Sequence, residues 1–237
     1  MKSILITGAS SGIGRATALE FLNEGWRVGL LARRKDRLSE IADAHENATS
    51  LPCDVTDPDA MQRAFGQFID TAGRLDALFN NAGTFGPSAP IDEVSLDEFD
   101  RVVNVNLRGM FIAARLAFAQ MRGQSPQGGR IINNGSLSAH VPRPGSICYT
   151  TTKHAITGMT RTLSLDGRPY DIACGQIDIG NATSEMVSDL KAAQPEMQVM
   201  DTRHAARSVL HMAQLPLDAN VQFMTVMATK MPYIGRG

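Results

Sequence analysis

The chain has 237 residues, a formal net charge of -1 at pH 7 and 43% hydrophobic residues. A chain of this length and apolar content can bury a sizeable core, as one domain or at most two small ones. The near-neutral charge argues against a general nucleic-acid-binding protein. No apolar run reaches the ~18 residues of a membrane span, and the first apolar stretch is too short for a signal peptide. We therefore expect neither nucleic acid nor a membrane as a partner.

The cysteines and histidines indicate no metal site. The three cysteines, Cys53, Cys148 and Cys174, are odd in number and widely spaced, and the five histidines show no ligand spacing. This usage is typical of reduced thiols, so we expect a cytoplasmic protein.

Short apolar runs alternate with longer stretches of helical periodicity along the chain. In chain order, we predict a strand over 2–7, a helix over 12–24, a strand over 26–32, a helix over 35–44, a strand over 50–53, a helix over 58–72, a strand over 75–79, a helix over 95–122, a strand over 130–133, a helix over 149–165, and strands over 171–177 and 221–226.

This alternation predicts an α/β fold. Strands separated by helical stretches of ten or more residues imply right-handed crossovers and a parallel sheet. Near-continuous apolar strands are typical of a sheet covered on both faces. We predict a single domain over residues 1–237, with a doubly wound parallel sheet of about seven strands and helices on both faces. The Gly- and Pro-containing stretch 123–129 is interpreted as a surface loop rather than a domain boundary.

A glycine-rich turn, Thr7-Gly-Ala-Ser-Ser-Gly-Ile-Gly14, joins the first predicted strand to the first predicted helix. Glycines there permit a tight turn, close approach of a phosphate, and close helix–strand packing. The N–H groups and dipole of the helix can then hold a pyrophosphate. The spacing differs from the general G-x-G-x-x-G fingerprint, and ordinary turns also contain glycine. The predicted contacts are Gly8, Ser10, Ser11, Gly12, Ile13 and Gly14.

The residues that end the second predicted strand indicate which dinucleotide binds. In dinucleotide-binding folds, an acidic residue at this point binds the ribose of NAD, whereas a nearby arginine accommodates the 2′-phosphate of NADP. Here the strand is followed by Arg33 and Arg34, with no acid. A guanidinium can grip a phosphate with two hydrogen bonds. We predict NADP(H) in preference to NAD(H); the alternative is a pair of solvated arginines.

Four motifs in order resemble the short-chain dehydrogenase/reductase family. They are the glycine turn, Asn80-Asn81-Ala82-Gly83, Ser136, and Tyr149-x-x-x-Lys153. The resemblance extends from residue 2 to about residue 179, roughly three-quarters of the chain. It implies a Rossmann-like domain that transfers a hydride between a nicotinamide cofactor and a carbonyl or alcohol.

The chemistry of three motif residues supports this interpretation. Tyr149 and Lys153 are four residues apart, so they share one face of a helix. A phenol with a pKa near 10 is a poor base at pH 7, and a neighbouring ammonium can lower that pKa. Ser136 follows a predicted strand, where its hydroxyl can hydrogen-bond the substrate oxygen; Ser138 is the alternative serine. Cys148 adjoins Tyr149 but has no histidine partner, so we do not expect a thiol nucleophile.

The resemblance assigns further roles. It implies that Lys153 also holds the nicotinamide ribose, and that the helix backbone at Asn106 holds a water of the proton relay. Asn104 competes for this assignment, but the Asn-Leu-x-Gly context favours Asn106. Asp54, with Val55 beside it, matches the aspartate that binds the adenine amino group; the alternative is a helix cap. The segment that packs beside adenosine and ribose comprises Asn81, Ala82 and Gly83, or is an ordinary Asn/Gly turn.

The region after the sixth predicted strand departs from the family pattern. Most relatives have Pro-Gly followed by a Thr that contacts the nicotinamide carboxamide. Here Cys174 replaces the Pro and Ile179 stands at the expected Thr. Backbone atoms of Ile177 can still bind the carboxamide, and Thr183 or Ser184 can supply the hydroxyl.

Two segments are expected to select the substrate, namely 140–146 and 181–195, of which the second is predicted to form a lid. Arg143 in the first can meet an acidic substrate, or is a solvated loop arginine. The tail, 224–237, is expected to begin as a strand and to extend to a neighbouring subunit. The family commonly pairs its two long helices, here 95–122 and 149–165, across two-fold axes, which implies a homodimer or homotetramer.

Together these features predict an NADP(H)-dependent oxidoreductase acting on a small carbonyl or secondary alcohol of unknown identity. A first alternative is a non-catalytic NADP(H)-binding sensor or scaffold, because a fold does not fix a function. A second is a 3-ketoacyl-carrier-protein reductase, which would need a basic docking patch at the mouth of the site.

Overall fold

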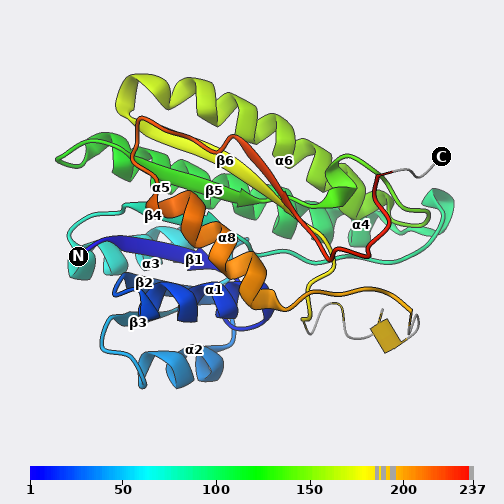
Figure 1. The fold of residues 1–237 in the computed structure, drawn as a ribbon, viewed down its shortest axis with the longest axis horizontal. Coiled ribbons are helices and arrows are strands. Elements are labelled where there is room, and N and C mark those ends of the chain that lie inside the picture. The colour runs from blue at the N-terminus through cyan, green and yellow to red at the C-terminus, as the bar shows by residue number, and fades with distance from the viewer. Residues whose placement is uncertain (185–186, 188–190, 193–195, 235–237) are drawn as a thin grey trace.

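A computed structural model describes residues 1–184, 187, 191–192 and 196–234. Its strands form one parallel sheet with the order β3-β2-β1-β4-β5-β6-β7 (Figure 1). The strands are β1 (Ser3–Thr7), β2 (Arg27–Ala32), β3 (Ala48–Pro52), β4 (Ala77–Asn80), β5 (Gly129–Asn134), β6 (Ile172–Ile179) and β7 (Phe223–Val226). The predicted seven-stranded, doubly wound parallel sheet is confirmed.

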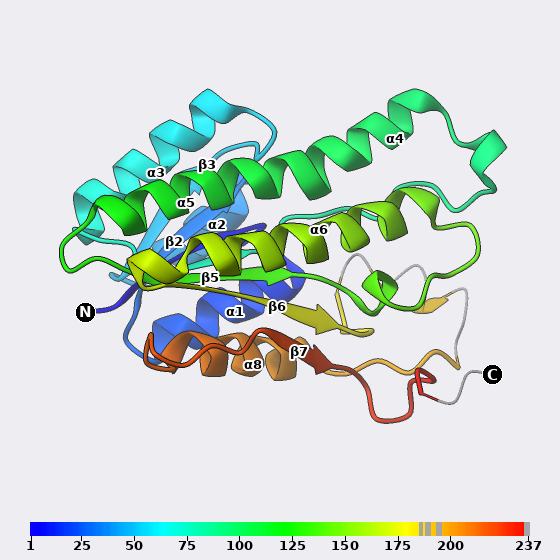
Figure 2. The same ribbon diagram turned by 90° about the horizontal axis from the view of Figure 1, so that it is seen from above.

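Helices cover both faces of the sheet (Figure 2). Their apolar side chains pack into two clusters of buried residues, one on each face. One face carries α1 (Gly12–Asn23), α2 (Lys35–Ala42) and α8 (Thr202–Gln214), and the other carries α3 (Pro58–Ala72), α4 (Leu96–Val103), α5 (Met110–Gly123) and α6 (Ile147–Asp166).

The final crossover differs from the prediction that all crossovers are right-handed. The helices that join β4 to β5 and β5 to β6 lie on the α3 face, but α8 lies on the opposite face, against α1. The connection from β6 to β7 therefore has the opposite hand. The apolar stripe of α8, which includes Ala205, Val209 and Met212, is buried against α1, and this burial fixes the helix there.

The long predicted helix over 95–122 is present and has a π-helical stretch, Asn104–Gly109, between α4 and α5. By length and composition alone, the 28-residue span Leu96–Gly123 would be able to cross a membrane. In this fold, however, α5 packs against β4 and β5, and its buried residues recur at helical spacing. We therefore interpret it as a core helix. Isolated π turns occur frequently at functional sites.

The sixth strand is longer than predicted. Cys174 and Gly175 lie inside β6, whereas the sequence comparison placed the family's Pro-Gly there, after the strand. That placement is wrong. Gly175 interrupts the apolar pattern for a packing reason: a Cβ atom on it would lie 2.1 Å from the carbonyl oxygen of Val221. The strand ends at Ile179, so Ile179 and Gly180 occupy the end of the strand, where the family's Pro-Gly was expected.

Candidate active site

A cavity of about 1230 Å³ opens at the carboxyl ends of the central strands. The order of the strands reverses between β1 and β4, which is where open α/β sheets bind ligands. The cavity brings together nearly all of the predicted site residues. Those that line it are Gly8, Ser10, Ser11, Gly12, Ile13, Gly14, Arg33, Arg34, Asp54, Val55, Asn81, Ala82, Gly83, Ser136, Tyr149 and Lys153. The two that do not line it are Asn106 and Ile177.

The glycine turn has the geometry of an anion cradle. Gly8 and Gly12 have positive φ angles of 70° and 51°, which other residues rarely adopt. A Cβ atom on Gly14 would lie only 2.2 Å from the carbonyl oxygen of Gly8. At the start of α1, Ser11 makes no side-chain cap and the first turn contains no acid. Within the described part of the chain, no side chain accepts a hydrogen bond from the N–H groups of this turn, so the residues present fit a pyrophosphate.

Beyond the glycine turn, the cavity contains the arginines and the aspartate that were expected to bind the nucleotide. Arg33 and Arg34 are exposed after β2, and Arg34 Nε donates to Ser10 Oγ at 3.2 Å. Asp54 follows β3, and its Oδ1 accepts hydrogen bonds from the N–H and hydroxyl of Thr56 at 2.9 and 2.8 Å. The helix cap of α3 is Asp57, which argues against a capping role for Asp54.

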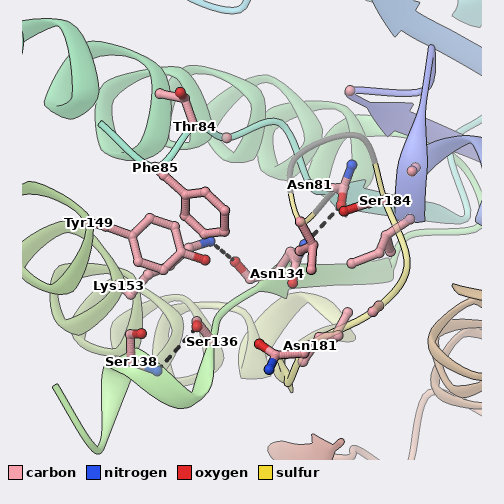
Figure 3. A pocket seen from close by; sticks show the side chains of 18 of the residues that line it. Asn81, Thr84, Phe85, Asn134, Ser136, Ser138, Tyr149, Lys153, Asn181 and Ser184 are labelled. Atoms are coloured by element: carbon pink, nitrogen blue, oxygen red, sulfur yellow. Dashed lines mark hydrogen bonds between the residues drawn. The ribbon is translucent and has the colours of Figure 1, made fainter. Parts of the chain in front are cut away.

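A hydrogen-bond network joins the ends of three strands at the centre of the cavity. Thr7 Oγ1 accepts from the N–H groups of Asn81 and Ala82 at 2.8 and 3.0 Å, and Asn81 Nδ2 also donates to Thr7 O at 2.9 Å. Asn134 Nδ2 then donates to Asn81 Oδ1 at 2.8 Å (Figure 3). Asn134 was not predicted; its signal was a polar pair, Asn133-Asn134, at the end of an apolar strand.

Ser136, Tyr149 and Lys153 lie together in the same pocket (Figure 3). Lys153 is 3% exposed, and its Nζ donates to Asn134 O at 2.7 Å. Burial lowers the pKa of Lys153 to about 8. Burial also raises the pKa of Tyr149, and its hydrogen bond with Ser136 opposes this rise. Tyr149 thus interacts with the predicted serine, and Ser138 donates its N–H to Ser136 Oγ at 3.1 Å.

That Lys153 lowers the pKa of Tyr149 stays a prediction. The ammonium is directed to a backbone carbonyl and lies 5.4 Å from the centroid of the Tyr149 ring. The effect that dominates at Tyr149 is burial, which raises its pKa. The physical reason is that both groups are desolvated, and desolvation disfavours the charged form of each.

Asp178 is a buried charge that the sequence analysis missed. It is 1% exposed and accepts from Ser136 N at 2.9 Å, Gln176 Nε2 at 2.7 Å and His140 Nε2 at 2.8 Å. It therefore fixes the backbone of the serine loop, and its negative charge raises the pKa of both Tyr149 and Lys153. The available signal was the spacing of Gln176 and Asp178, two polar residues on one face of an apolar strand.

Asn106 lies beneath the cavity, not in it. It is fully buried in the π-helical stretch, whereas Asn104 is exposed. Its side chain accepts from Thr84 N at 2.7 Å and donates to Thr84 O at 2.8 Å and to Thr152 Oγ1 at 3.2 Å. Asn106 thus ties the loop after β4 to α6. Its role in a proton relay stays a prediction.

The predicted contact at Ile177 is placed differently by the structure. Ile177 is fully buried inside β6, and its carbonyl oxygen accepts from Gly135 N at 2.9 Å. Because the strand continues for two more residues, the cavity is lined at this point by Ile179, Gly180, Asn181 and Ala182. Of the two candidate hydroxyls, Ser184 lines the cavity, whereas Thr183 bonds Met200 O.

The predicted lid and tail both reach this cavity. Much of the predicted lid, namely 185–186, 188–190 and 193–195, lies outside the described residues. Val187 of the lid lines the cavity, as does Met197 just beyond it. The tail was expected to extend to a neighbouring subunit. Lys230, Met231, Pro232 and Tyr233 line the cavity of their own chain, and the extension to a neighbouring subunit stays a prediction.

Comparison with known proteins identifies the family. The sequence model described as short chain dehydrogenase matches residues 2–195. The chain belongs to the short-chain dehydrogenase family. This membership places it among oxidoreductases that use a nicotinamide cofactor, and it confirms the resemblance carried by the motifs.

Individual members of the short-chain dehydrogenase family are similar at moderate identity. The chain is 33% identical to a 3beta-hydroxysteroid dehydrogenase of Mediterraneibacter gnavus over 180 residues, which cover 74% of this chain and 64% of that protein. It is 34% identical to an A-factor type gamma-butyrolactone 1′-reductase of Streptomyces virginiae, over 82% of this chain and 79% of that one. The NADH complex of a 3-ketoacyl-(acyl-carrier-protein) reductase from Brucella melitensis has a TM-score of 0.88 at 24% identity, with 98% of each chain covered. That last likeness shows the fold alone.

Proposed function

We propose that this short-chain dehydrogenase is an NADP(H)-dependent enzyme that interconverts a carbonyl compound and a secondary alcohol. The observation that carries the proposal is that Ser136, Tyr149 and Lys153 share one cavity with the glycine turn of α1. An anion cradle and a proton-transferring group in one continuous space are what such a reaction requires.

The cofactor, when bound, supplies or takes up the hydride. The side chains around it have separate tasks. Tyr149 moves the proton to or from the substrate oxygen, and the Ser136 hydroxyl hydrogen-bonds that same oxygen. Lys153 carries a positive charge beneath the Tyr149 ring and holds the ribose, while Asp178 keeps Ser136 in place through its N–H group.

Replacement of Tyr149 by Phe tests this assignment. Removal of the proton-transferring hydroxyl should lower kcat for carbonyl reduction by about 10²-fold or more, with little effect on NADPH affinity. Tyr170→Phe is the matched control, because Tyr170 packs on Phe118 and does not line the cavity. Reduction at the native rate by Tyr149→Phe would show that the assignment is wrong.

The preference for NADP(H) rests on Arg33 and Arg34 at the end of β2. Titrations with NADPH and NADH should give tighter binding of NADPH, by about 10-fold or more for a charge-assisted pair with phosphate. Arg33→Asp should reverse the preference, and Arg37→Asp, which alters an exposed arginine paired with Glu40, should not. An unchanged preference in Arg33→Asp would contradict the role of Arg33.

The same experiments separate the alternatives. Tight cofactor binding with no turnover across a broad carbonyl panel would favour a sensor or scaffold, and selective turnover of carrier-linked ketoacyl groups would favour a ketoacyl reductase.

We further propose a homodimer or homotetramer in the cytoplasm. Exposed Phe111 on α5 and Leu165 on α6, together with three buried free cysteines, support this. Light scattering of Phe111→Asp tests the assembly: a smaller mass supports it, and an unchanged mass argues against this face.

A further inference from the structure

Arg143 is a cation beside the proposed proton-transferring group. It lines the cavity, and its Cζ lies 5.7 Å from the centroid of the Phe85 ring. The Phe85 ring in turn lies edge-on to Tyr149, with centroids 4.9 Å apart and planes at 69° (Figure 3). One aromatic ring therefore separates the guanidinium from Tyr149.

The loop that carries Arg143 is held in place at both ends. Ser146 Oγ donates to Arg143 O at 2.7 Å, and the same hydroxyl bonds Thr150 Oγ1 at 3.0 Å in the first turns of α6. At the other end of the loop, His140 pairs with Asp178 at 2.8 Å. The backbone of Arg143 is thus fixed to the helix that carries Tyr149 and to the strand that positions Ser136.

Within the described residues, no carboxylate forms an ion pair with Arg143. Glu196 lines the cavity without such a pair, and Asp54 lies at the nucleotide end. Two further cations, Arg101 and Lys230, line the same cavity. By contrast, Arg74, Arg203 and Arg207 each form an ion pair with an acid of this chain. Arg143 is thus held near Tyr149 without an ion-pair partner among the described acids, so its guanidinium is available to bind an anionic ligand.

We propose that Arg143 binds a carboxylate of the substrate, so that the enzyme interconverts an oxo acid and the corresponding hydroxy acid. This inference rests on the proposed function and names its substrate class. The planar guanidinium matches a carboxylate through two parallel hydrogen bonds. Because the guanidinium lies one aromatic ring away from Tyr149, the proposed substrate has a short carbon chain between the reacting carbonyl and the carboxylate. The carboxylate takes no part in the bond changes, which remain those of the proposed reaction.

The test compares charged and neutral substrates of one shape. Initial rates of NADPH oxidation are measured with 3-oxobutanoate and 4-oxopentanoate and with the corresponding amides. The native enzyme should show a higher kcat/KM for the acids. In Arg143→Gln, kcat/KM for the acids should fall by about 10- to 100-fold, mostly through KM, and for the amides by less than about 3-fold. Arg143→Lys should recover part of the lost kcat/KM for the acids, because lysine keeps the positive charge but cannot form two parallel hydrogen bonds with a carboxylate.

Arg122→Gln is the matched control. Arg122 Cζ lies 5.6 Å from the centroid of the Tyr170 ring, so it makes a similar arginine–aromatic contact outside the cavity. Its substitution should change kcat/KM neither for the acids nor for the amides. NADPH titration and thermal unfolding of Arg143→Gln should match the native protein, because Arg143 is exposed.

Two results would overturn the inference. If Arg143→Gln lowers kcat/KM for acids and amides alike, Arg143 acts on Tyr149 and not on the substrate charge. If the native enzyme reduces only the amides, or shows no preference for the acids, the substrate class is wrong while the proposed function stands. Lack of turnover with every acid and every amide would count against both the proposed function and this inference.

Discussion

The buried ammonium of Lys153 should make the protein less stable than a variant that lacks it. Lys153→Met keeps the length of the side chain and removes the charge. Burial lowers the pKa of this group from 10.5 to about 8, and one pKa unit corresponds to about 1.4 kcal/mol, so the buried charge costs about 3 kcal/mol at pH 7. The variant loses one hydrogen bond to Asn134 O, which costs about 1 kcal/mol. We expect Lys153→Met to be more stable by about 2 kcal/mol at pH 7 and to lose most of its activity.

The pH dependence gives this prediction its sign. Because the pKa in the folded state lies below that in the unfolded state, the unfolded chain binds the proton more tightly. The destabilisation by Lys153 is complete below pH 8 and disappears as the pH rises to 10.5. Between pH 7 and 10, the native protein should therefore gain about 2 to 3 kcal/mol relative to Lys153→Met. The raised pKa of Tyr149 is present in both proteins and cancels to first order in the difference.

The assay is urea unfolding of both proteins at several pH values between 7 and 10, with Lys35→Met, an exposed lysine of α2, as the control. The stability difference for the control should stay nearly constant. A difference between the native protein and Lys153→Met that does not change with pH would refute the argument from burial, because it would mean that the lysine is solvated in the folded state.

Three other predictions follow from packing and burial. Gly14→Ala would place a Cβ atom 2.2 Å from Gly8 O, so it should weaken NADPH binding at least 10-fold and lower the free energy of unfolding by about 1 to 3 kcal/mol. The control Gly158→Ala has open space around it and should raise the free energy of unfolding by about 0.5 to 1 kcal/mol. Similar effects in both variants would contradict this steric argument. Asp178→Ala leaves buried N–H donors unpaired and should cost about 3 kcal/mol or more in urea unfolding, while Asp178→Asn, which keeps an acceptor, should cost clearly less. Burial raises the pKa of Cys174 to about 12, so an aromatic disulfide reagent at pH 8 should modify it only after unfolding; rapid modification of the folded protein would argue against this burial.

Motifs that depend on local geometry were predictable from the sequence. Gly8, Gly12 and Gly14 each meet a steric demand set within a few residues of the turn, and Tyr149 and Lys153 share a helix face at any register of the helix in the fold. For this reason both motifs can be recognised without any tertiary contact. The doubly wound parallel sheet also followed from the alternation of apolar runs, because helices between parallel strands allow few topologies.

The features that were missed all depend on residues far apart in the sequence. The predicted strand ended at Ile177, whereas pairing with β7 continues β6 to Ile179, which is why the contact at Ile177 was misplaced. Asp178 shows its role only when the serine loop and His140 fold against it. The strength of desolvation at Lys153 and Tyr149 likewise depends on everything packed around both groups.

By itself, the sequence determined the fold class, the family, the glycine cradle and the three residues that can carry out the proposed chemistry, because each follows from local spacing and residue type. Only the tertiary structure decided where the sixth strand ends, that the tail lines the cavity of its own chain, that a buried carboxylate supports the serine loop, and that Arg143 lies one ring away from Tyr149. These are long-range contacts, and their energies depend on burial that no short stretch of sequence specifies.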